Sequence, residues 1–292
     1  MAKPRYNTDG PWLKGNTHIH STFSDGGLTY VELHERYAGA GYDFLFHTDH
    51  NHVSRASSEA GLELLALDGV EIDGGDGVAV EYHVVALGYS GELPQEASLA
   101  EKLRLLRKGG ALLVLAHPQW CGNSVEEALR YGFDGVEVYN DLCRWLNGKG
   151  EGAYFWDRML CGNQRTLGFA ADDTHLNERH RSWNGGWIMV NAAELTREAV
   201  MAAIRRGDFY SSCGPEIHSI HTSETEVRLT TSPARTVRLV GSTSHHQADV
   251  ASEEAGKSEW VLELPRDWPY IRLEIEDLQG RRAWTNTLLL PD

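Results

Sequence analysis

Residues 111–118 read Ala-Leu-Leu-Val-Leu-Ala-His-Pro, an uninterrupted apolar run that stops at His117. Such a run is typical of a β-strand covered on both faces, as in a parallel sheet flanked by helices. Similar short runs recur on both sides of it, through the first two thirds of the chain. The predicted strands are 16–20, 43–48, 64–72, 83–88, 111–116, 135–139, 166–170 and 186–190.

Segments with helical periodicity separate these strands, and most of them stop at a glycine. They cover residues 29–40, 96–108, 124–131, 151–160 and 196–206. Glycine directly after the last periodic residue favours a helix end, because it adopts the left-handed backbone at little steric cost. Repeated strand–helix units predict an α/β fold, either a parallel barrel or a doubly wound sheet.

The pattern changes near Gly214-Pro215. Segments 226–230, 236–240, 258–264, 270–276 and 282–290 alternate apolar and polar residues, as half-buried antiparallel strands do. We therefore predict two domains, an α/β unit at residues 1–215 and a small antiparallel β unit at residues 216–292. The Ser-, Glu- and Gly-rich stretch 242–257 is predicted to be a mobile loop, with His245 and His246 in solvent.

The composition is acidic, because 27 Lys and Arg residues against 42 Asp and Glu residues give a net charge of −15 over 292 residues. This balance disfavours binding to long nucleic acids or to anionic membranes. No apolar run approaches the roughly 20 residues of a membrane helix. The first residues also lack a signal-like apolar segment, so a cytoplasmic location is expected. The sequence does not indicate an oligomeric state.

The cysteine spacing does not resemble that of a metal-binding motif. The four cysteines, Cys121, Cys143, Cys161 and Cys213, lie far apart without any Cys-x-x-Cys spacing. This spacing predicts reduced, mostly buried thiols and disfavours a zinc–thiolate site.

Histidine and carboxylate side chains, by contrast, recur at the carboxyl ends of predicted strands. In a parallel barrel these ends share one face, where active sites lie. His18 and His20 are two residues apart on a strand and so point to the same side. Glu71 is followed by a glycine-rich loop and then His83, and a hairpin there would bring His83 to the same rim. Mixed imidazole and carboxylate ligands suit zinc, manganese or iron.

Five short motifs together resemble the PHP (polymerase and histidinol phosphatase) superfamily over roughly residues 12–215. They are Gly15-Asn-Thr-His-Ile-His-Ser-Thr-Phe-Ser-Asp-Gly26, Thr48-Asp-His-Asn51, Gly69-Val-Glu-Ile72, Ala116-His-Pro118 and Asp173-Thr-His175. The tail, including Ala283-Trp-Thr-Asn286, is similar to the β extension of the branch that contains CehA/McbA-type metallohydrolases. The resemblance implies a distorted (β/α)7 barrel with seven parallel strands.

The resemblance also implies a centre of two or three divalent metal ions. One ion would take His18, His20, Glu71 and Asp173; a second would share Glu71 and add His83 and His117; a third would take Asp25, His50 and His175. Because Asp25 and His175 are both present, we expect three ions.

Phosphoester hydrolysis is the reaction that such a centre predicts. A hydroxide that bridges two ions and is held by Glu71 is a good nucleophile near neutral pH, because metals lower the pKa of bound water. A third ion would bind an anionic phosphoryl oxygen. The expected substrate is a small phosphorylated molecule: a monoester, a nucleotide or a cyclic phosphodiester. A carbamate or ester hydrolase with the same centre is the alternative, and a non-catalytic PHP module ranks below both.

Several residues near the motifs have candidate supporting roles. Asp49 either orients a neighbouring ligand or bonds to backbone, and both roles stay open. Arg179 and Arg181 are candidates for bidentate phosphate contact, and Asn140 for a further substrate contact. His47 is expected to pack against a helix, and His180 to lie in solvent.

Overall fold

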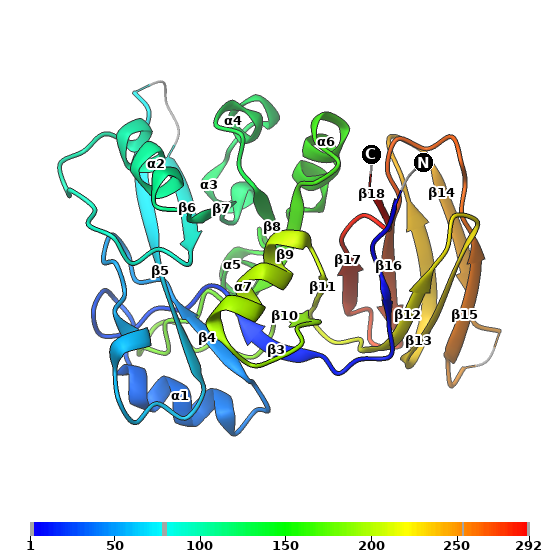
Figure 1. The fold of residues 1–292 in the computed structure, drawn as a ribbon, viewed down its shortest axis with the longest axis horizontal. Helices are drawn as coiled ribbons and strands as arrows, with labels where there is room; N and C mark the ends of the chain where they lie inside the picture. Colours follow the sequence, from blue (N-terminus) through cyan, green and yellow to red (C-terminus); the bar gives the residue numbers. More distant parts are fainter. Residues whose placement is uncertain (1–2, 78–80, 253, 291–292) are drawn as a thin grey trace.

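Strand β7 (Leu112–Leu115) is fully buried, as its apolar run predicts, in the computed structural model, which describes residues 3–77, 81–252 and 254–290. It pairs in parallel with β8 (Gly135–Asn140) and antiparallel with β6 (Glu81–Leu87). Helices surround this half of the sheet (Figure 1). The chain therefore has a mixed α/β fold, as predicted.

Two groups of parallel strands flank β6. The parallel pairs are β3–β4, β4–β5, β7–β8 and β8–β9, where β3 is Leu13–Asn16, β4 is Phe44–His47, β5 is Leu65–Gly75 and β9 is Leu167–Ala171. β6 runs antiparallel to both neighbours because it returns along β5 as a hairpin. The prediction of seven parallel strands is therefore wrong. The order of paired strands is also open, running from β2 to β9 without returning to its start.

Isolated bridges continue the pairing beyond the carboxyl ends of these strands. Ile19 bridges Thr174 in parallel, and the backbone N–H of His20 donates to the carbonyl of Thr174 over 2.9 Å. His50 bridges Glu71 in the same way. The segments that follow β3, β4 and β9 and the middle of β5 are thereby held side by side, and they carry four of the five motifs.

The five predicted helices are present. α1 (Tyr30–Ala38) shows how local residues set the ends of a helix. Thr29 and Glu32 form a capping box at its first turn, and the helix ends at Gly39. The others are α2 (Leu99–Lys108), α4 (Val125–Arg130), α6 (Ala153–Gly162) and α7 (Arg197–Arg206). Three short helices were not predicted, namely η1 (Ala56–Ser58), α3 (Pro118–Cys121) and α5 (Asp141–Asn147).

The remaining strands are antiparallel to their neighbours, and those that follow residue 215 stand beside the helical half (Figure 1). They are β10 (Trp187–Val190), β11 (Phe209–Ser212), β12 (Ile217–Thr222), β13 (Glu226–Val240), β14 (His246–Val250), β15 (Lys257–Glu263), β16 (Arg272–Asp277), β17 (Arg282–Thr285) and β18 (Leu289–Leu290). The first strands, β1 (Lys3–Pro4) and β2 (Asn7–Thr8), pair with β18 and β12. Both ends of the described chain therefore lie in this region.

Two predictions for the tail were wrong. β13 is one strand where two were expected, because Pro233 sits at a shift in register between Thr230 and Ala234 and does not end the strand. The predicted mobile loop contains β14, which pairs with β13. His245 is not free in solvent either, since its ring stacks on that of Trp268 with centroids 5.2 Å apart.

Arg272 ties the tail to the helical half. Its side chain is 2% exposed, and it donates to both carboxylate oxygens of Asp157 in α6, over 2.9 and 3.1 Å. The guanidinium also lies 4.9 Å from the centre of a Trp156 ring.

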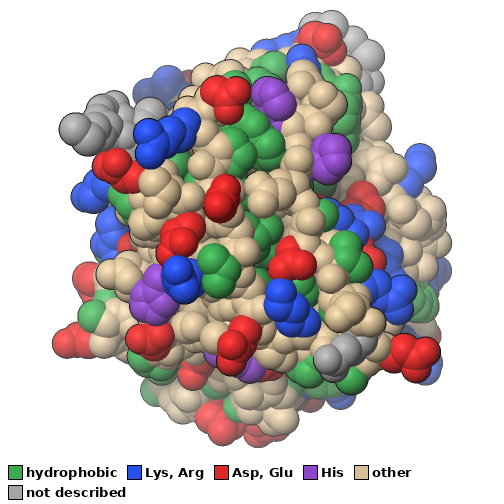
Figure 2. All heavy atoms as spheres, turned by 90° about the vertical axis from the view of Figure 1, so that its right-hand side faces the viewer, with side chains coloured by type: hydrophobic (Ala, Val, Ile, Leu, Met, Phe, Trp, Pro, Cys, Tyr) green, Lys and Arg blue, Asp and Glu red, His purple; other side chains and the backbone are tan. Residues whose placement is uncertain are grey.

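Charges of both signs are spread over the outer face of the tail. Figure 2 shows Lys and Arg side chains interspersed with Asp and Glu side chains there. Among the described residues, no helix is long and apolar enough to cross a membrane.

Candidate metal centre

Glu71, on β5, is the hub of a buried cluster of imidazoles and carboxylates. Its side chain is 1% exposed, and its Oε2 atom faces three histidines. Oε2 lies 3.1 Å from Nε2 of His18, 3.3 Å from Nε2 of His20 and 3.2 Å from Nδ1 of His50. The first and second predicted motifs therefore meet at one oxygen atom of the third.

The other oxygen of Glu71 faces two further histidines. Its Oε1 lies 2.8 Å from Nδ1 of His83 and 3.4 Å from Nε2 of His117. The β5–β6 hairpin explains the place of His83, because the register pairs it with Asp73, two residues beyond Glu71 and on the same face of the strand. The expected hairpin is present and brings His83 to the cluster.

Asp173 supplies a second buried carboxylate. Its Oδ1 lies 3.3 Å from Nε2 of His18 and 3.1 Å from Nε2 of His20, whereas its Oδ2 lies 3.6 Å from Nε2 of His117. Asp173 and His117 both have positive φ angles, 53° and 26°. Such angles are strained for residues with a Cβ and are often found at functional sites.

Asp25 and His175 close the open side of the cluster. Oδ2 of Asp25 lies 3.2 Å from Nε2 of His175, and the Asp25 side chain is 54% exposed. The ring of His175 stacks on that of His20 with centroids 4.2 Å apart. The loop that carries Asp25 folds tightly onto the backbone, since a Cβ at Gly26 would lie only 2.4 Å from the carbonyl oxygen of His20. Glycine is therefore required there.

The cluster fits divalent metal ions. Within the described residues, Nε2 of His18, Nδ1 of His50 and Oε2 of Glu71 are buried without a well-aligned hydrogen-bond partner, although they face one another. A cation between them would satisfy all three. The possible ligand sets are His20–Asp25–His50–His175, His18–His20–Asp173, His50–Glu71–His83, His18–His117–Glu137 and His117–Cys143–Asp173.

The electrostatics of the metal-free cluster are consistent with cation binding. Burial lowers the pKa of His18 and His20, but the carboxylates of Asp173 and Glu71 outweigh it, raising that of His20 to about 9 and that of His18 well above its usual range. Burial raises the pKa of Glu71 and Asp173, but His18 and other imidazoles hold both pKa values well below their usual range. Metal ions would replace the protons that balance these carboxylates.

A solved structure shares the fold of this chain. A two-domain protein from Bacteroides vulgatus that contains a predicted PHP-like metal-dependent phosphoesterase matches with a TM-score of 0.55 and 14% identity, over 98% of each chain. This chain therefore shares the fold of that protein. Two more distant likenesses have TM-scores of 0.47 and 0.42.

The first of these is a proposed metal-dependent phosphoesterase from Bifidobacterium adolescentis, at 18% identity over 70% of this chain and 98% of that one. The second is an amidohydrolase from Chromobacterium violaceum with bound sulfate and no metal, at 17% identity over 55% of this chain and 87% of that one. No family model matches the sequence, and no curated protein matches it.

Glu137 is a part of the buried cluster that the sequence analysis missed. Its Oε1 lies 2.7 Å from Nδ1 of His18, and its Oε2 accepts hydrogen bonds from the backbone N–H of His117 and from the amide of Asn140, both over 2.9 Å. The available signal was a single acid inside the apolar strand segment Gly135-Val-Glu-Val138. A buried carboxylate in such a strand needs partners, and here the partners belong to the cluster.

Asp49 holds the loop after β3 in place through hydrogen bonds. It accepts hydrogen bonds from the backbone N–H and hydroxyl of Ser21, over 2.7 and 2.8 Å, and from the hydroxyl of Ser24 over 2.8 Å. It reaches His20 only through Ser24, whose Oγ lies 3.5 Å from Nδ1 of that histidine. Asp49 therefore shapes the first motif and does not contact a candidate ligand side chain.

The predicted substrate contacts lie elsewhere than expected. Arg179 and Arg181 are exposed and do not line the cavity at the cluster, because the loop after His175 directs them outward. Asn140 is buried, donates to Glu137 and Asp173, and does not line the cavity at the cluster. His180, expected in solvent, does line the cavity.

The cavity above the cluster has a volume of about 160 Å³. One wall is apolar and is formed by Trp120, Leu142 and Leu146 beside Cys143. The described residues that line this cavity include no lysine or arginine. Positive charge for an anionic substrate would thus come from metal ions.

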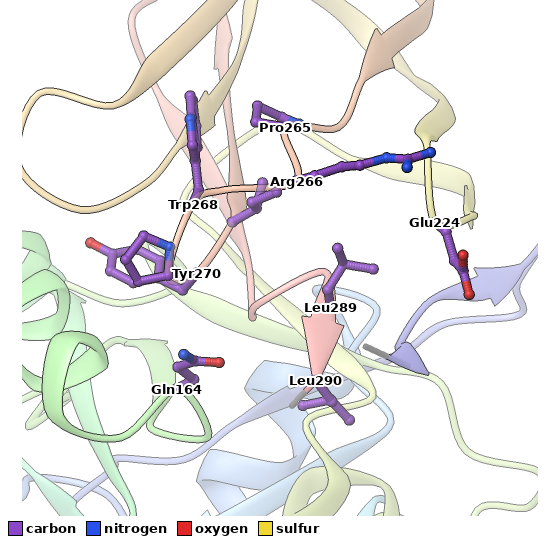
Figure 3. A pocket seen from close by; sticks show the side chains of 10 residues that line it. Gln164, Glu224, Pro265, Arg266, Trp268, Tyr270, Leu289 and Leu290 are labelled. Atoms are coloured by element: carbon purple, nitrogen blue, oxygen red, sulfur yellow. The ribbon is translucent and has the colours of Figure 1, made fainter. Parts of the chain in front are cut away.

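A larger cavity, of about 400 Å³, lies in the tail (Figure 3). Trp268, Tyr270, Leu289 and Leu290 form much of its lining, with Arg266 and Glu224 at its edge. Its described lining residues contain neither histidine nor cysteine, so this cavity lacks the ligand chemistry of the cluster.

Proposed function

We propose that this protein is a metal-dependent phosphoesterase that hydrolyses a small phosphorylated molecule. The observation that carries the proposal is the convergence of all the predicted ligands around Glu71 and Asp173, with Asp25 and His175 at the open side. Divalent ions bound there would lower the pKa of a water molecule and offset the charge of a phosphoryl oxygen. We propose zinc, manganese or iron, and three ions per chain.

The protein's own residues would position those ions and the substrate. Glu71 and Asp173 each offer two oxygens to different histidines, so each can serve two neighbouring ions. Glu137 fixes the ring of His18 from the opposite side. The small cavity admits a phosphoryl group with a modest substituent, and the net charge of −15 disfavours long nucleic acids.

We also propose that residues 1–215 form the catalytic unit, a distorted PHP-type barrel, and residues 216–292 a β extension. The Ile19–Thr174 bridge supports the barrel, since it links the segments after β3 and β9. Strands β1 and β2 pair with the extension, so the first residues would brace both units.

A phosphate-release screen tests the proposal. Purified protein loaded with zinc, manganese or iron(II) is offered phosphomonoesters, nucleotides and cyclic phosphodiesters. We expect metal-dependent turnover of at least one class, abolished in Glu71→Gln and unchanged in Glu59→Gln, an exposed glutamate outside the cluster. Circular dichroism checks that both variants fold. Absence of turnover with every metal and substrate class would overturn the phosphoesterase assignment.

A carbamate or ester hydrolase is the second candidate. The apolar wall of Trp120, Leu142 and Leu146, together with the absence of lysine and arginine among the described lining residues, favours an uncharged carbonyl substrate. Metal-dependent cleavage of aryl carbamates or esters without phosphate release would select this candidate. A non-catalytic PHP module would cleave neither class, and the intact ligand set argues against it.

A further inference from the structure

We infer that Cys143 is a metal ligand of this centre and that its thiolate biases the site toward zinc, iron(II) or cobalt(II). The inference deepens the proposed function and rests on its metal centre. Cys143 is 2% exposed and lines the cavity over the cluster. One potential ligand atom from each of Cys143, His117 and Asp173 lies within 4.8 Å of the other two. That spacing suits three ligands of one ion.

The position of the thiol is fixed by the same side chain that holds Asp173. Asn140 Oδ1 accepts a hydrogen bond from the backbone N–H of Cys143 over 2.9 Å, and its Nδ2 donates to Oδ2 of Asp173 over 3.2 Å. The backbone N–H of Leu142 also donates to the carbonyl of Asp172 over 3.1 Å. The first turn of α5 is therefore locked to the end of β9, and the thiol and the carboxylate keep their spacing.

The surroundings leave the sulfur available to a cation. Within the described residues, no hydrogen bond involves Sγ of Cys143. Oδ2 of Asp173, which lies 3.6 Å from Nε2 of His117, is not shared with His18 or His20, which face Oδ1. The buried unpartnered Oε2 of Glu71 is an independent sign that the cluster is built for cations.

A second thiol nearby has a different role. Sγ of Cys121 lies 3.4 Å from Nδ1 of His117, the ring nitrogen opposite to the one that faces Asp173. Cys121 can therefore orient the ring but cannot share an ion bound at Nε2. This difference makes Cys121 a matched control for Cys143.

The chemistry of sulfur determines which metal ions a thiolate ligand would favour. On binding, the S–H bond of Cys143 breaks, its proton passes to solvent and a sulfur–metal bond forms, with no change of oxidation state. Thiolate is a soft ligand that favours zinc and other late divalent ions over manganese and magnesium. The cysteine spacing in the sequence disfavoured a thiolate site. The three proposed ligands follow three different strands, β7, β8 and β9, so no local spacing motif joins them.

Cobalt(II) spectroscopy tests the inference. Wild-type protein loaded with cobalt should show a near-ultraviolet thiolate-to-metal charge-transfer band, retained in Cys121→Ser and in Cys161→Ser, which changes an exposed cysteine. Cys143→Ser should lose the band while still binding cobalt, and its preference for zinc over manganese should fall about tenfold or more. X-ray absorption of the zinc-loaded wild type should show a sulfur neighbour at about 2.3 Å.

The outcomes separate the two proposals. Wild-type protein that binds cobalt without the band, or zinc without a sulfur neighbour, would overturn the role of Cys143 and leave the metal centre standing. A band that persists in Cys143→Ser would overturn it as well. Wild-type protein that binds no metal at all would overturn both.

Discussion

The carboxylate of Glu137 lies 2.7 Å from Nδ1 of His18, on the side of the ring opposite to Glu71 and Asp173. Nδ1 donates to this carboxylate, so a metal ion that displaces the proton from Nε2 would meet the lone pair of that nitrogen, which faces the cluster. Such a contact fixes both the tautomer and the orientation of a metal-binding histidine. Glu137 is thus a positioning residue for the proposed centre.

Replacing Glu137 by Gln should weaken the centre without emptying it. Both oxygens of Glu137 accept hydrogen bonds, one from His18 and the other from the N–H groups of His117 and Asn140. Glutamine has one oxygen and one NH₂ group, and the NH₂ group cannot accept, so one of these contacts would be lost. We expect metal affinity or turnover to fall by roughly 10–100-fold, as for other contacts behind metal-binding histidines. Metal titration followed by elemental analysis measures the affinity.

The matched control for this variant is Glu59→Gln, which makes the same change at an exposed position. It should leave metal affinity at the wild-type value. Equal affinity in Glu137→Gln and wild-type protein would show that Glu137 does not position His18.

Asp25→Asn should remove one ion and spare the others. Asp25 contacts His175 and His20, at 3.2 and 3.8 Å, whereas Glu71 and Asp173 also face His18 and His117. A neutral amide is a poor ligand for a third cation, whereas the sites at the two buried carboxylates keep their ligands. We expect the metal content to fall by about one equivalent per chain.

Elemental analysis of dialysed protein checks this stoichiometry, with Asp267→Asn as a control at an exposed position in the tail. Phosphate release should fall more than metal binding if the third ion holds the phosphoryl oxygen. An unchanged metal content in Asp25→Asn would contradict a third site at Asp25.

The sequence was enough to predict that these side chains lie together, because each motif carries its own local signal. His18, Glu71 and His117 each occur where an apolar run meets polar residues, and the strands bring such positions together. Glu137 gave only the weak signal of one acid in an apolar segment. Its importance depends on His18, which is 119 residues away in sequence.

The wall of the cavity could not be predicted, because it depends on α5. This helix has seven residues and starts immediately after β8, too short to give a clear helical period. The segment that carries Leu142, Cys143 and Leu146 was therefore assigned to neither a helix nor a strand. Arg179 was misplaced for a similar reason: its loop is shaped by contacts such as Asn177 with Asp25, which sequence spacing does not encode.

Leu146→Arg should shift substrate preference toward phosphates. Leu146 lines the cavity and is 40% exposed, so a guanidinium there can reach an anionic group without being buried. We expect KM for small phosphomonoesters to fall several-fold, because arginine binds phosphate through charge and paired hydrogen bonds. Uncharged esters should gain nothing.

Steady-state kinetics on both substrate classes measure this change. Leu129→Arg is the control, since Leu129 is similarly exposed but does not line the cavity. An identical KM shift in both variants would mean that the effect comes from overall charge.

Two buried histidines, His34 on α1 and His47 on β4, lie outside the proposed metal centre and contact each other. Nε2 of His34 lies 3.0 Å from Nε2 of His47, and Nδ1 of His34 accepts a hydrogen bond from the backbone N–H of Leu64 over 3.1 Å. His34 therefore carries its proton on Nε2 and donates it to a neutral His47. Burial lowers the pKa of His34 to about 4, and burial followed by the nearby His34 holds that of His47 well below its usual range.

This pair should make the fold sensitive to acid. In the unfolded chain both histidines take up protons near pH 6.5, whereas in the folded chain His34 has a pKa of about 4 and the pKa of His47 lies well below its usual range. Their contribution to stability is therefore complete above pH 6.5 and is lost as the pH falls toward 4. Each proton that only the unfolded chain binds lowers the free energy of unfolding by up to about 1.4 kcal/mol for each pH unit of acidification.

Thermal melts between pH 5 and 7, with a chelator present throughout, measure this slope. The double variant His34→Gln/His47→Gln keeps polar groups at both positions but does not titrate there, so its Tm should fall less steeply with acid than that of the wild type. His246→Gln, which replaces an exposed histidine, should keep the wild-type slope. The histidines of the cluster around Glu71 are unchanged in every variant, so their contribution cancels in the comparison. Parallel slopes for the double variant and the wild type would show that the buried pair does not set the acid sensitivity.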